Sequence, residues 1–395
     1  MKICRSFGGC FFLLLVFFVQ KGNVTAKAFT GTYGINYGRL ANNIPSPKQV
    51  VRLLKAAKIK NVRIYDADHS VLDAFSGSGL DLVIGVNNGL VKDMSDNGDR
   101  ALNWVKENVH AYVPNTHIVG IAVGNEVLGS GDLDLESALY GAVRNIYNAT
   151  RKLQLDRVVQ ITTAHSQLVF SNSYPPSSCV FKEDVVQNMK KLLDLFTQIG
   201  SPFCLNAYPF LAYMGNPDHI DINYALFKPT DGIYDEKSKL HYDNMLDAQI
   251  DAAYAALEDA GFSKMEVIVT ETGWASHGDE KEGAATPSNA RTYNYNLRKR
   301  LSKRKGTPRR PKSMLKAYVF ALFNENLKTG AGSERNFGLY KPDGKIAYDI
   351  GFPALKSSST SSRFSIKELG LQSWHSSYIL VVTACSSALY LFLRP

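Results

Sequence analysis

The sequence has 395 residues, of which 45% are hydrophobic, and a formal net charge of +9. That length is normal for one large barrel domain. The whole charge excess lies in one segment, because residues 298–312 hold nine Lys and Arg and no acid. A nucleic-acid-binding face would need basic residues with interleaved aromatics, so we expect no nucleic-acid partner. The segment is then a solvated loop, or a contact for acidic wall polymers or anionic lipid.

The first 28 residues have the three parts of a secretory signal peptide. Two basic residues precede an apolar run over 10–19, and residues 26–28 (AKA) offer a small-x-small cleavage site. The apolar run is too short for a transmembrane helix. We therefore expect a secreted protein whose mature chain begins at Phe29.

Eight apolar segments between Phe29 and Leu355 have the length and composition of buried strands, and helical segments alternate with them. This order indicates a (β/α)8 TIM barrel, with 29–355 as the catalytic domain. A doubly wound sheet is the alternative, but no G-x-G-x-x-G follows the first strand and no P-loop motif is present. The expected strands are Thr32–Tyr37, Val62–Tyr65, Leu82–Val86, Ile118–Val123, Val158–Thr163, Phe203–Asn206, Val267–Thr270 and Ala317–Phe323.

Helix starts are readable at two places. Ser46 is a good N-cap and Pro47 suits the first helical position. Thr286-Pro287 repeats the same signal before the last strand. Both signals support helices between the expected strands.

The connection between Asn206 and Val267 is too long for one loop and one helix. Its second half carries an apolar face that begins at Leu246 and reaches a helix stop at Gly261. We therefore expect a small insertion on the barrel rim between strands six and seven.

The C-terminus has the order of a GPI-attachment signal. Small residues lie in the Ser-rich linker and spacer 356–377, and an apolar tail fills 378–395. Ser359 is the middle of several candidate attachment residues. The tail is shorter than a bilayer span. We expect a lipid-anchored protein on the outer face of the plasma membrane, with a short transmembrane anchor or a removed propeptide as the alternatives.

Two cysteines remain once the signal and the tail are removed. Cys179 and Cys204 could pair in the oxidising secretory route or stay as buried thiols, and the sequence leaves both open. Asn148 begins the sequence Asn-Ala-Thr, an acceptor for N-glycosylation.

Chemistry in such barrels sits at the carboxyl ends of the strands. Strand four ends in Asn125 and Glu126, and strand seven ends in Glu271. Because these strands are not neighbours, the two carboxylates should face each other across the mouth. Other polar and aromatic residues at strand ends are Tyr37, Tyr65, Asp66, Tyr208, Trp274, Glu325, Lys328 and Glu334.

These residue types favour glycoside hydrolysis. One carboxyl group protonates the leaving oxygen while the other attacks the anomeric carbon or activates water. Aromatic rings suit the apolar faces of sugars, and Asn125 could bind a hydroxyl beside the bond being broken. Metal hydrolysis and serine hydrolysis lose support, since His clusters are absent from the predicted mouth and G-x-S-x-G from the whole sequence. We expect no metal and no cofactor.

Six motifs, in order along the chain, resemble the plant endo-1,3-β-glucanases of glycoside hydrolase family 17. They are GINYGRLANNIPSP, NVRIYDAD, AVGNEV, NAYPF, VTETGW and FALFNENLKTG, and the resemblance runs from about Thr32 to Phe352. It implies a (β/α)8 barrel and retaining hydrolysis of internal bonds in 1,3-β-glucan, a substrate such as callose.

The resemblance also implies roles for single residues. Glu126 matches the acid/base, and Glu271 matches the nucleophile. The remaining matched positions lie near the substrate groove: Tyr37, Tyr208, Trp274, Glu325, Lys328 and Glu334. We expect the enzyme to act as a monomer.

Several alternatives stay open. The enzyme could cleave mixed-linkage 1,3;1,4-β-glucan, or the chain could be a glucan-binding wall protein without turnover. Tyr37 and Tyr65 could be ordinary barrel packing. Glu325 and Glu334 could be structural ion-pair partners, and Asp66 could cap a helix.

Overall fold

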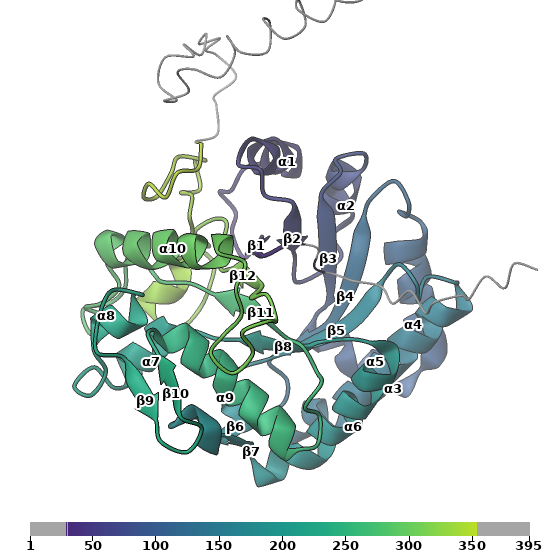
Figure 1. The fold of residues 1–395 in the computed structure, drawn as a ribbon. Helices are drawn as coiled ribbons and strands as arrows, with labels where there is room; N and C mark the ends of the chain where they lie inside the picture. Colours follow the sequence, from purple (N-terminus) through teal and green to yellow (C-terminus); the bar gives the residue numbers. More distant parts are fainter. Residues whose placement is uncertain (1–28, 30, 354–395) are drawn as a thin grey trace, which may run out of the picture. The chain divides into compact units, whose positions relative to one another are not determined.

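The eight expected strands close into one parallel barrel, which confirms the predicted (β/α)8 fold (Figure 1). The computed structural model describes residue 29 and residues 31–353. Around the barrel the strand order is β1-β12-β11-β8-β5-β4-β3-β2, with β2 closing on β1. The barrel strands are β1 (Tyr33–Asn36), β2 (Asn61–Arg63), β3 (Asp81–Val86), β4 (Ile118–Asn125), β5 (Gln160–His165), β8 (Phe203–Asn206), β11 (Val267–Thr272) and β12 (Ala317–Val319).

Helices surround the barrel and pack their apolar faces on it (Figure 1). A π-helical turn over Lys106–His110 continues α4, and three 3-10 turns lie at Gln167–Val169, Pro176–Ser178 and Gly332–Arg335. The helices of the ring are α1 (Pro47–Ala56), α2 (His69–Phe75), α3 (Asn88–Asp96), α4 (Gly98–Val105), α5 (Leu133–Lys152), α6 (Glu183–Ile199), α9 (Met245–Asp259) and α10 (Pro287–Ser302).

The helix starts lie where the sequence predicts them. Ser46 is the N-cap of α1, with Pro47 as the first helical residue. Thr286 is the N-cap of α10, and its hydroxyl accepts a hydrogen bond from the Asn289 N–H at 3.2 Å. These caps satisfy N–H groups that have no partner inside the helix.

The predicted rim insertion between β8 and β11 is present. It consists of α7 (Pro209–Gly215), α8 (Ile222–Ala225) and a hairpin of β9 (Ile233–Asp235) and β10 (Leu240–Tyr242). The following helix, α9, ends just before Gly261, whose φ of 97° suits the predicted stop.

A second rim hairpin was not predicted. Strands β6 (Phe170–Asn172) and β7 (Val180–Phe181) pair after β5. The buried Asp235 joins the two hairpins, because its carboxylate accepts hydrogen bonds from the Ser177 N–H at 2.8 Å and the Ser177 hydroxyl at 2.7 Å. The two hairpins are therefore linked, and they keep the loops at the carboxyl ends of the barrel strands in place.

The core explains why the strands are nearly continuous apolar runs. Helices cover the outer face of the barrel, and side chains fill its inside, so both faces of each strand are buried. At the amino-terminal end of the barrel, Phe29 packs edge-on against Tyr318 with 4.5 Å between ring centroids. These two rings form a small cluster with Val83, Ala122 and Ile268.

Strand bounds differ from the predicted ones at functional positions. β4 continues to Asn125 and β11 continues to Thr272, so Glu271 lies inside a strand and not after it. The register of β11 shifts between Val269 and Glu271 against β8. β5 begins two residues later than predicted, since the Val158 side chain is 57% exposed.

Two further expectations are settled by the described residues. Cys179 and Cys204 are both buried free thiols, so they do not pair. The basic segment 298–312 is only partly a loop, because α10 continues to Ser302.

Of the helices in the described ranges, none is long and apolar enough to cross a bilayer. The predicted signal peptide 1–28, the linker and spacer 356–377, the tail 378–395 and the attachment residue Ser359 lie outside the described residues.

Candidate active site

The carboxyl ends of the barrel strands open into a cleft of about 1060 Å³. The cleft brings together nearly all of the predicted site residues from seven different segments of the chain. Those that line it are Tyr37, Tyr65, Asn125, Glu126, Tyr208, Glu271, Glu325, Lys328 and Glu334.

A corner in the backbone aims Glu126 into the cleft. Gly124 and Glu126 have φ values of 67° and 54°, so the chain turns sharply as β4 ends. Two bonds fix this corner from α3: the Asn88 amide donates to the Asn125 carbonyl at 3.0 Å, and the Asn88 side-chain oxygen accepts from the Asn125 N–H at 2.8 Å. The Glu126 N–H donates to the Ala164 carbonyl of β5 at 2.9 Å.

The surroundings of Glu126 favour its protonated form. Burial, followed by the nearby Glu271 carboxylate, raises the pKa of Glu126 to about 7. The main opposing contact is a hydrogen bond from the Asn206 amide to Glu126 Oε1 at 2.7 Å. A carboxyl group with this pKa can hold a proton near neutral pH and donate it.

The surroundings of Glu271 supply hydrogen-bond donors to both of its carboxylate oxygens. Arg63 donates to Glu271 Oε1 at 3.0 Å, and both side chains are buried. The Tyr208 hydroxyl donates to Glu271 Oε2 at 2.8 Å. Each carboxylate oxygen thus accepts a hydrogen bond, and one of the donors carries a positive charge.

The guanidinium of Arg63 also orients the neighbouring amides. It donates to Asn125 Oδ1 at 2.8 Å, and the Asn206 amide donates to the same oxygen at 3.3 Å. Asn206 is itself oriented by Thr270, whose hydroxyl donates to its side-chain oxygen at 2.8 Å. With its oxygen engaged, Asn125 presents its NH₂ group as the free donor on the cleft wall.

A third carboxylate lies on the same side of the mouth as β12. Glu325 is buried, and its Oε1 accepts from the Leu40 N–H at 2.8 Å. Burial raises the pKa of Glu325, while Lys328, whose Nζ lies 3.9 Å from its carboxylate, lowers it. The same ammonium lies 3.4 Å from Glu334 and 4.1 Å from the centre of the Phe320 ring. The predicted cluster of Glu325, Lys328 and Glu334 is therefore present.

Strand order divides the cleft into two arms on either side of Glu126 and Glu271. Between β4 and β11 lie β5 and β8 in one direction, and β12, β1, β2 and β3 in the other. The neutral arm, on the β5 and β8 side, is lined by Ser166, Gln167, Leu168, Ser173, Leu211, Ala212 and Gln249. The charged arm, on the other side, is lined by Arg39, Leu40, Asp66, Asp68, Glu325, Lys328 and Glu334.

The two arms differ in how their polar groups are engaged. In the neutral arm, the Gln167 amide nitrogen and the Gln249 amide oxygen are buried and lack a hydrogen-bond partner among the described residues. In the charged arm, Arg39 pairs with both Asp66 and Asp68. Asp66 is thus an ion-pair partner, and the residue that caps α2 is Asp68, whose side chain accepts from the Ser70 and Val71 N–H groups.

Trp274 does not line the cleft, contrary to the expectation from the sequence. Its ring is completely buried, and its N–H donates to the Ala284 carbonyl at 2.9 Å. It packs against Phe210 and Tyr293, with centroid distances of 5.2 Å and 5.6 Å. Trp274 therefore supports the loop after β11 from behind.

Sequence reasoning missed Arg63 and Asn206 as site residues. Both are the last residues of their strands and point into the barrel, where Arg63 donates to Glu271 and Asn206 donates to Glu126. A signal was available for Arg63: a charged residue in a short apolar strand is buried only when it is paired. Asn206 closes β8 at the position where the other strands carry their functional side chains.

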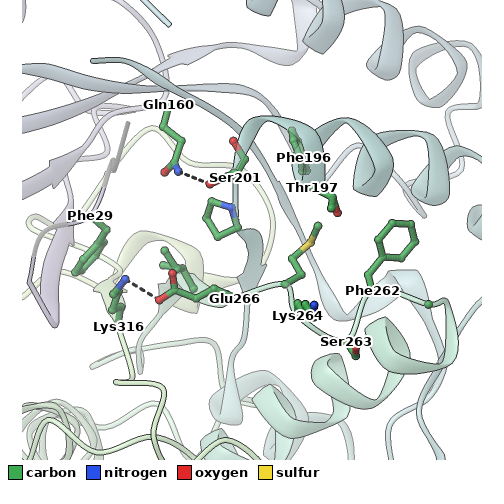
Figure 2. Close-up of a pocket in the computed structure, with 15 residues that line it drawn as sticks. Phe29, Gln160, Phe196, Thr197, Ser201, Phe262, Ser263, Lys264, Glu266 and Lys316 are labelled. Carbon is green, nitrogen blue, oxygen red and sulfur yellow. Dashed lines mark hydrogen bonds and ion pairs between the residues drawn. The ribbon is translucent and has the colours of Figure 1, made fainter. Parts of the chain in front are cut away.

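A second cavity lies at the amino-terminal end of the barrel, opposite the cleft. Figure 2 shows its lining, which includes Phe29, Phe196 and Phe262; its volume is about 470 Å³. Its polar groups are engaged with each other or with the backbone: Lys316 pairs with Glu266 at 2.6 Å, and the Gln160 amide donates to the Gly200 carbonyl at 3.1 Å. This cavity offers no pair of carboxylates for hydrolysis.

Two other predicted features can be placed. Asn148 is exposed on α5, which is compatible with glycosylation, and its modification stays a prediction. Within residues 29 and 31–353, no group of three His, Cys, Asp or Glu side chains is arranged to hold a metal ion.

Comparisons with known proteins agree with this geometry. Residues 33–352 match the family described as glycosyl hydrolases family 17. The chain is 45% identical over 339 residues to glucan endo-1,3-beta-glucosidase 14 of Arabidopsis thaliana, which covers 86% of each protein. It is 48% identical over 332 residues to glucan endo-1,3-beta-glucosidase 10 of the same plant, covering 83% of this chain and 77% of the relative.

Solved structures share the fold. CJP38, a beta-1,3-glucanase and pollen allergen of Cryptomeria japonica, is 40% identical, with a TM-score of 0.78 over 81% of this chain and 99% of that one. One of two plant beta-glucan endohydrolases with distinct substrate specificities is 34% identical, with a TM-score of 0.75 over 81% of this chain and all of that one.

Proposed function

Because this chain belongs to family 17 of the glycosyl hydrolases, we propose that it cleaves internal 1,3-β-glucosidic bonds by double displacement, with Glu126 as acid/base and Glu271 as nucleophile. The chain is a glycoside hydrolase by family. The observation that carries the assignment of roles is the contrast between the two carboxyl groups. Burial raises the pKa of Glu126 to about 7, whereas Arg63 and Tyr208 both donate to Glu271.

In the first step, Glu271 attacks the anomeric carbon and forms a glycosyl ester, while Glu126 gives its proton to the departing glycosidic oxygen. Arg63 stabilises the nucleophile as an anion before the attack. Its position is fixed by three acceptors: Glu271, Asn125 and the Thr270 carbonyl at 3.3 Å. A preorganised charge of this kind needs no rearrangement during the reaction.

In the second step, Glu126, now ionised, takes a proton from a water molecule that attacks the same carbon and releases Glu271. Two inversions leave the product with the configuration of the substrate. The hydrogen bond from Asn206 to Glu126 stabilises the ionised form that this step requires. Glu126 thus alternates between two protonation states, which its raised pKa makes accessible near neutral pH.

The two arms of the cleft explain how a polymer could be held at an internal bond. A cleft that continues on both sides of the catalytic pair accepts chain on both sides of the bond. In the neutral arm, the exposed Leu168 and Leu211 offer apolar surface to sugar faces, and Gln167 and Gln249 offer unpartnered amide groups to hydroxyls. The NH₂ group of Asn125 faces the hydroxyl nearest the cleaved bond.

Product analysis tests this proposal. The mature protein should release oligosaccharides of mixed length from linear 1,3-β-glucan from the earliest time points, whereas an exo-acting enzyme would release one short product. Glu271→Gln should release none above background. If the wild type binds the glucan and releases no product, the chain is a glucan-binding protein and the proposal fails.

A second candidate substrate is mixed-linkage 1,3;1,4-β-glucan. The observation in its favour is that the 34% identical solved neighbour comes from a pair of beta-glucan endohydrolases with distinct substrate specificities. Substrate specificity therefore differs between two plant beta-glucan endohydrolases, one of which has the fold of this chain. The same assay on mixed-linkage glucan decides it: a higher kcat/KM there than on linear 1,3-β-glucan would replace the first proposal.

Localisation is also proposed from the sequence. A signal peptide at 1–28 and a GPI anchor near Ser359 would place the enzyme at the outer face of the plasma membrane, where callose-like 1,3-β-glucan is within reach. Release from membranes by a phosphatidylinositol-specific phospholipase tests the anchor. Retention of the protein while a known GPI-anchored control is released would contradict it.

A further inference from the structure

The basic segment noted in the sequence forms one surface of the described molecule, away from the cleft. Between residues 287 and 317 the chain contains no Asp or Glu. Six side chains of this stretch are exposed cations, two on α10, one at its C-cap and three on the loop that follows, and we call them the cationic surface: Arg291, Lys299, Lys303, Arg304, Lys305 and Lys312. None of them lines the cleft.

The part of this surface on α10 and its C-cap is a stripe. Arg291, Tyr295, Lys299 and Lys303 follow one another at intervals of four residues, so each lies next to the following one along a line that winds about 40° per step around the helix. Twelve residues of helical rise give the stripe a length of about 18 Å. The Tyr295 ring is 42% exposed, and Arg291 and Lys299 each lie 5.7 Å from its centre.

The opposite face of α10 is firmly packed. Ala290, Tyr293, Leu297 and Leu301 are buried in the core. The helix therefore cannot rotate to bring the stripe inward, and the cations on it stay exposed to solvent.

The loop after α10 is held by arginines and presents mainly lysines. Arg309 and Arg310 both pair with Glu258 near the end of α9. The Arg309 N–H donates to the buried Asp251 at 2.7 Å. The hydrogen bond from Arg309 lowers the pKa of Glu258, as expected for an ionised partner.

One more arginine fixes the end of α10. Arg300 pairs with Asp247 at 3.1 Å and donates to the carbonyls of Lys305 and Gly306. The acids that α9 directs toward this loop are thus engaged by arginines. The lysines of the cationic surface remain exposed on a backbone that is already ordered, so a ligand need not order it.

We propose that the cationic surface binds an acidic polysaccharide, a linear polymer with a carboxylate on successive sugar residues, at a site separate from the cleft. Such a polymer matches a line of cations along the helix, because its charges also repeat along a line. Tyr295 adds an aromatic side chain between two cations, which suits sugar rings with carboxylates on either side. A lipid headgroup would pair with the cations, but it has no repeat of charges that follows the stripe.

The binding site differs from the cleft in chemistry as well as in place. The cleft carries carboxylates and would repel a polyanion, whereas the cationic surface would attract one. A polymer bound along α10 leaves the mouth of the barrel open. The enzyme could therefore be retained in an acidic matrix while it hydrolyses a neutral glucan.

Binding of the mature protein to polygalacturonate tests the proposal. The test variant is Lys299→Glu with Lys303→Glu and Lys305→Glu. The matched control is Lys152→Glu with Lys190→Glu and Lys191→Glu, which changes three exposed lysines of α5 and α6 and gives the same net charge. A Tyr295→Ala variant tests the aromatic contribution. Hydrolysis of a soluble neutral glucan, measured in parallel, reports that each variant is folded.

At low ionic strength, the wild type should bind polygalacturonate, and added salt should weaken the binding. The test variant should bind at least about tenfold more weakly, the control variant within about threefold of the wild type, and Tyr295→Ala about two- to fivefold more weakly. All should hydrolyse the neutral glucan at similar rates. Absence of wild-type binding, or equal loss in test and control variants, would overturn the proposal. Tighter binding to phosphatidylserine vesicles than to polygalacturonate would overturn it in favour of a membrane-facing surface.

Discussion

Glu126 and Glu271 are the same side chain placed on opposite sides of one cleft, and they differ in the hydrogen-bond donors that surround them. On the β11 side, Arg63 donates a hydrogen bond to one carboxylate oxygen of Glu271, and the Tyr208 hydroxyl donates to the other. On the β4 side, Glu126 accepts one side-chain hydrogen bond among the described residues, from the neutral amide of Asn206. Burial raises the pKa of Glu126 to about 7. The contrast teaches that one residue type can be given two different environments by the donors around it, and the proposed roles of acid and nucleophile rest on that difference.

Replacing either carboxylate by its amide should have the largest effect on activity. Glu271→Gln should lower kcat on the order of 10⁴-fold or more, because no covalent intermediate can form. Glu126→Gln should lower it about 10²- to 10⁴-fold on glucan, and much less on an aryl glycoside whose phenolate leaves without a proton. Steady-state kinetics on both substrates measure this. Equal losses on the two substrates for Glu126→Gln would contradict its role as the acid.

Removing the cation that pairs with Glu271 should have the next largest effect. Arg63→Met leaves Glu271 buried without its charged partner, so the free energy of unfolding at pH 7 should fall by about 3–5 kcal/mol, with kcat lowered about 10²-fold or more. Chemical denaturation and initial rates measure the two losses. The control is Arg63→Met combined with Glu271→Gln, which removes the unpaired charge and should regain part of the stability. A double variant no more stable than Arg63→Met would show that Arg63 serves packing alone.

A smaller effect is expected from the loss of the neutral hydrogen-bond donor to Glu271. Tyr208→Phe removes the hydrogen bond to Glu271 Oε2, and a hydrogen bond to a charged group of this kind corresponds to roughly a tenfold or larger loss in kcat/KM. Tyr140→Phe, on α5 and outside the cleft, is the matched control and should be unchanged. A Tyr208→Phe enzyme with wild-type kinetics would remove Tyr208 from the account of Glu271.

The smallest expected effect concerns the protonation of Glu126, which is measured by the pH dependence of kcat/KM. Since the acid must be protonated, kcat/KM should fall about tenfold per pH unit above pH 7. Asn206→Ala removes a hydrogen bond that lowers the pKa of Glu126, so the alkaline limb should move to higher pH. A limb that stays in place, or moves to lower pH, would contradict the assignment.

The same raised pKa has a consequence for stability. The folded-state pKa of Glu126, about 7, lies above the ordinary value of 4.5, so the folded protein binds this proton more tightly than the unfolded one. Its contribution to stability is complete below about pH 4.5 and is lost as pH rises through 7. Glu126→Gln should therefore stabilise the protein above pH 7, on the order of 1–3 kcal/mol, and do so less at pH 5.

The fold could be predicted because its signals are local. Strands buried on both faces read as apolar runs, and helix starts such as Ser46-Pro47 carry their own caps. The second hairpin, β6 and β7, gave no such signal. It is held by Asp235, which lies more than fifty residues later in the chain.

The site was predictable only in part, because side-chain direction depends on register and packing. Glu126 and Glu271 follow apolar runs and were found at once. Arg63 and Asn206 end β2 and β8 and point into the barrel, a direction that only the barrel register reveals. Trp274 was misplaced for the same reason: it lies three residues from Glu271, yet its ring faces Phe210 and Tyr293 behind the cleft.

The basic segment illustrates the limit of a charge count. Its nine cations looked like one solvated loop, but α10 includes the first of them, and the acids that bind three arginines lie on α9, about fifty residues earlier. Long-range pairing of this kind leaves no trace in the local sequence.

The central claim is that Glu271 forms the covalent bond to the sugar while Glu126 handles the proton. Mass spectrometry tests it most directly, after incubation with a 2-deoxy-2-fluoro glycosyl donor that bears a good leaving group and whose intermediate breaks down slowly. The account predicts one added glycosyl group, on the peptide that contains Glu271. A label on the Glu126 peptide, or no label together with product of inverted configuration, would contradict it.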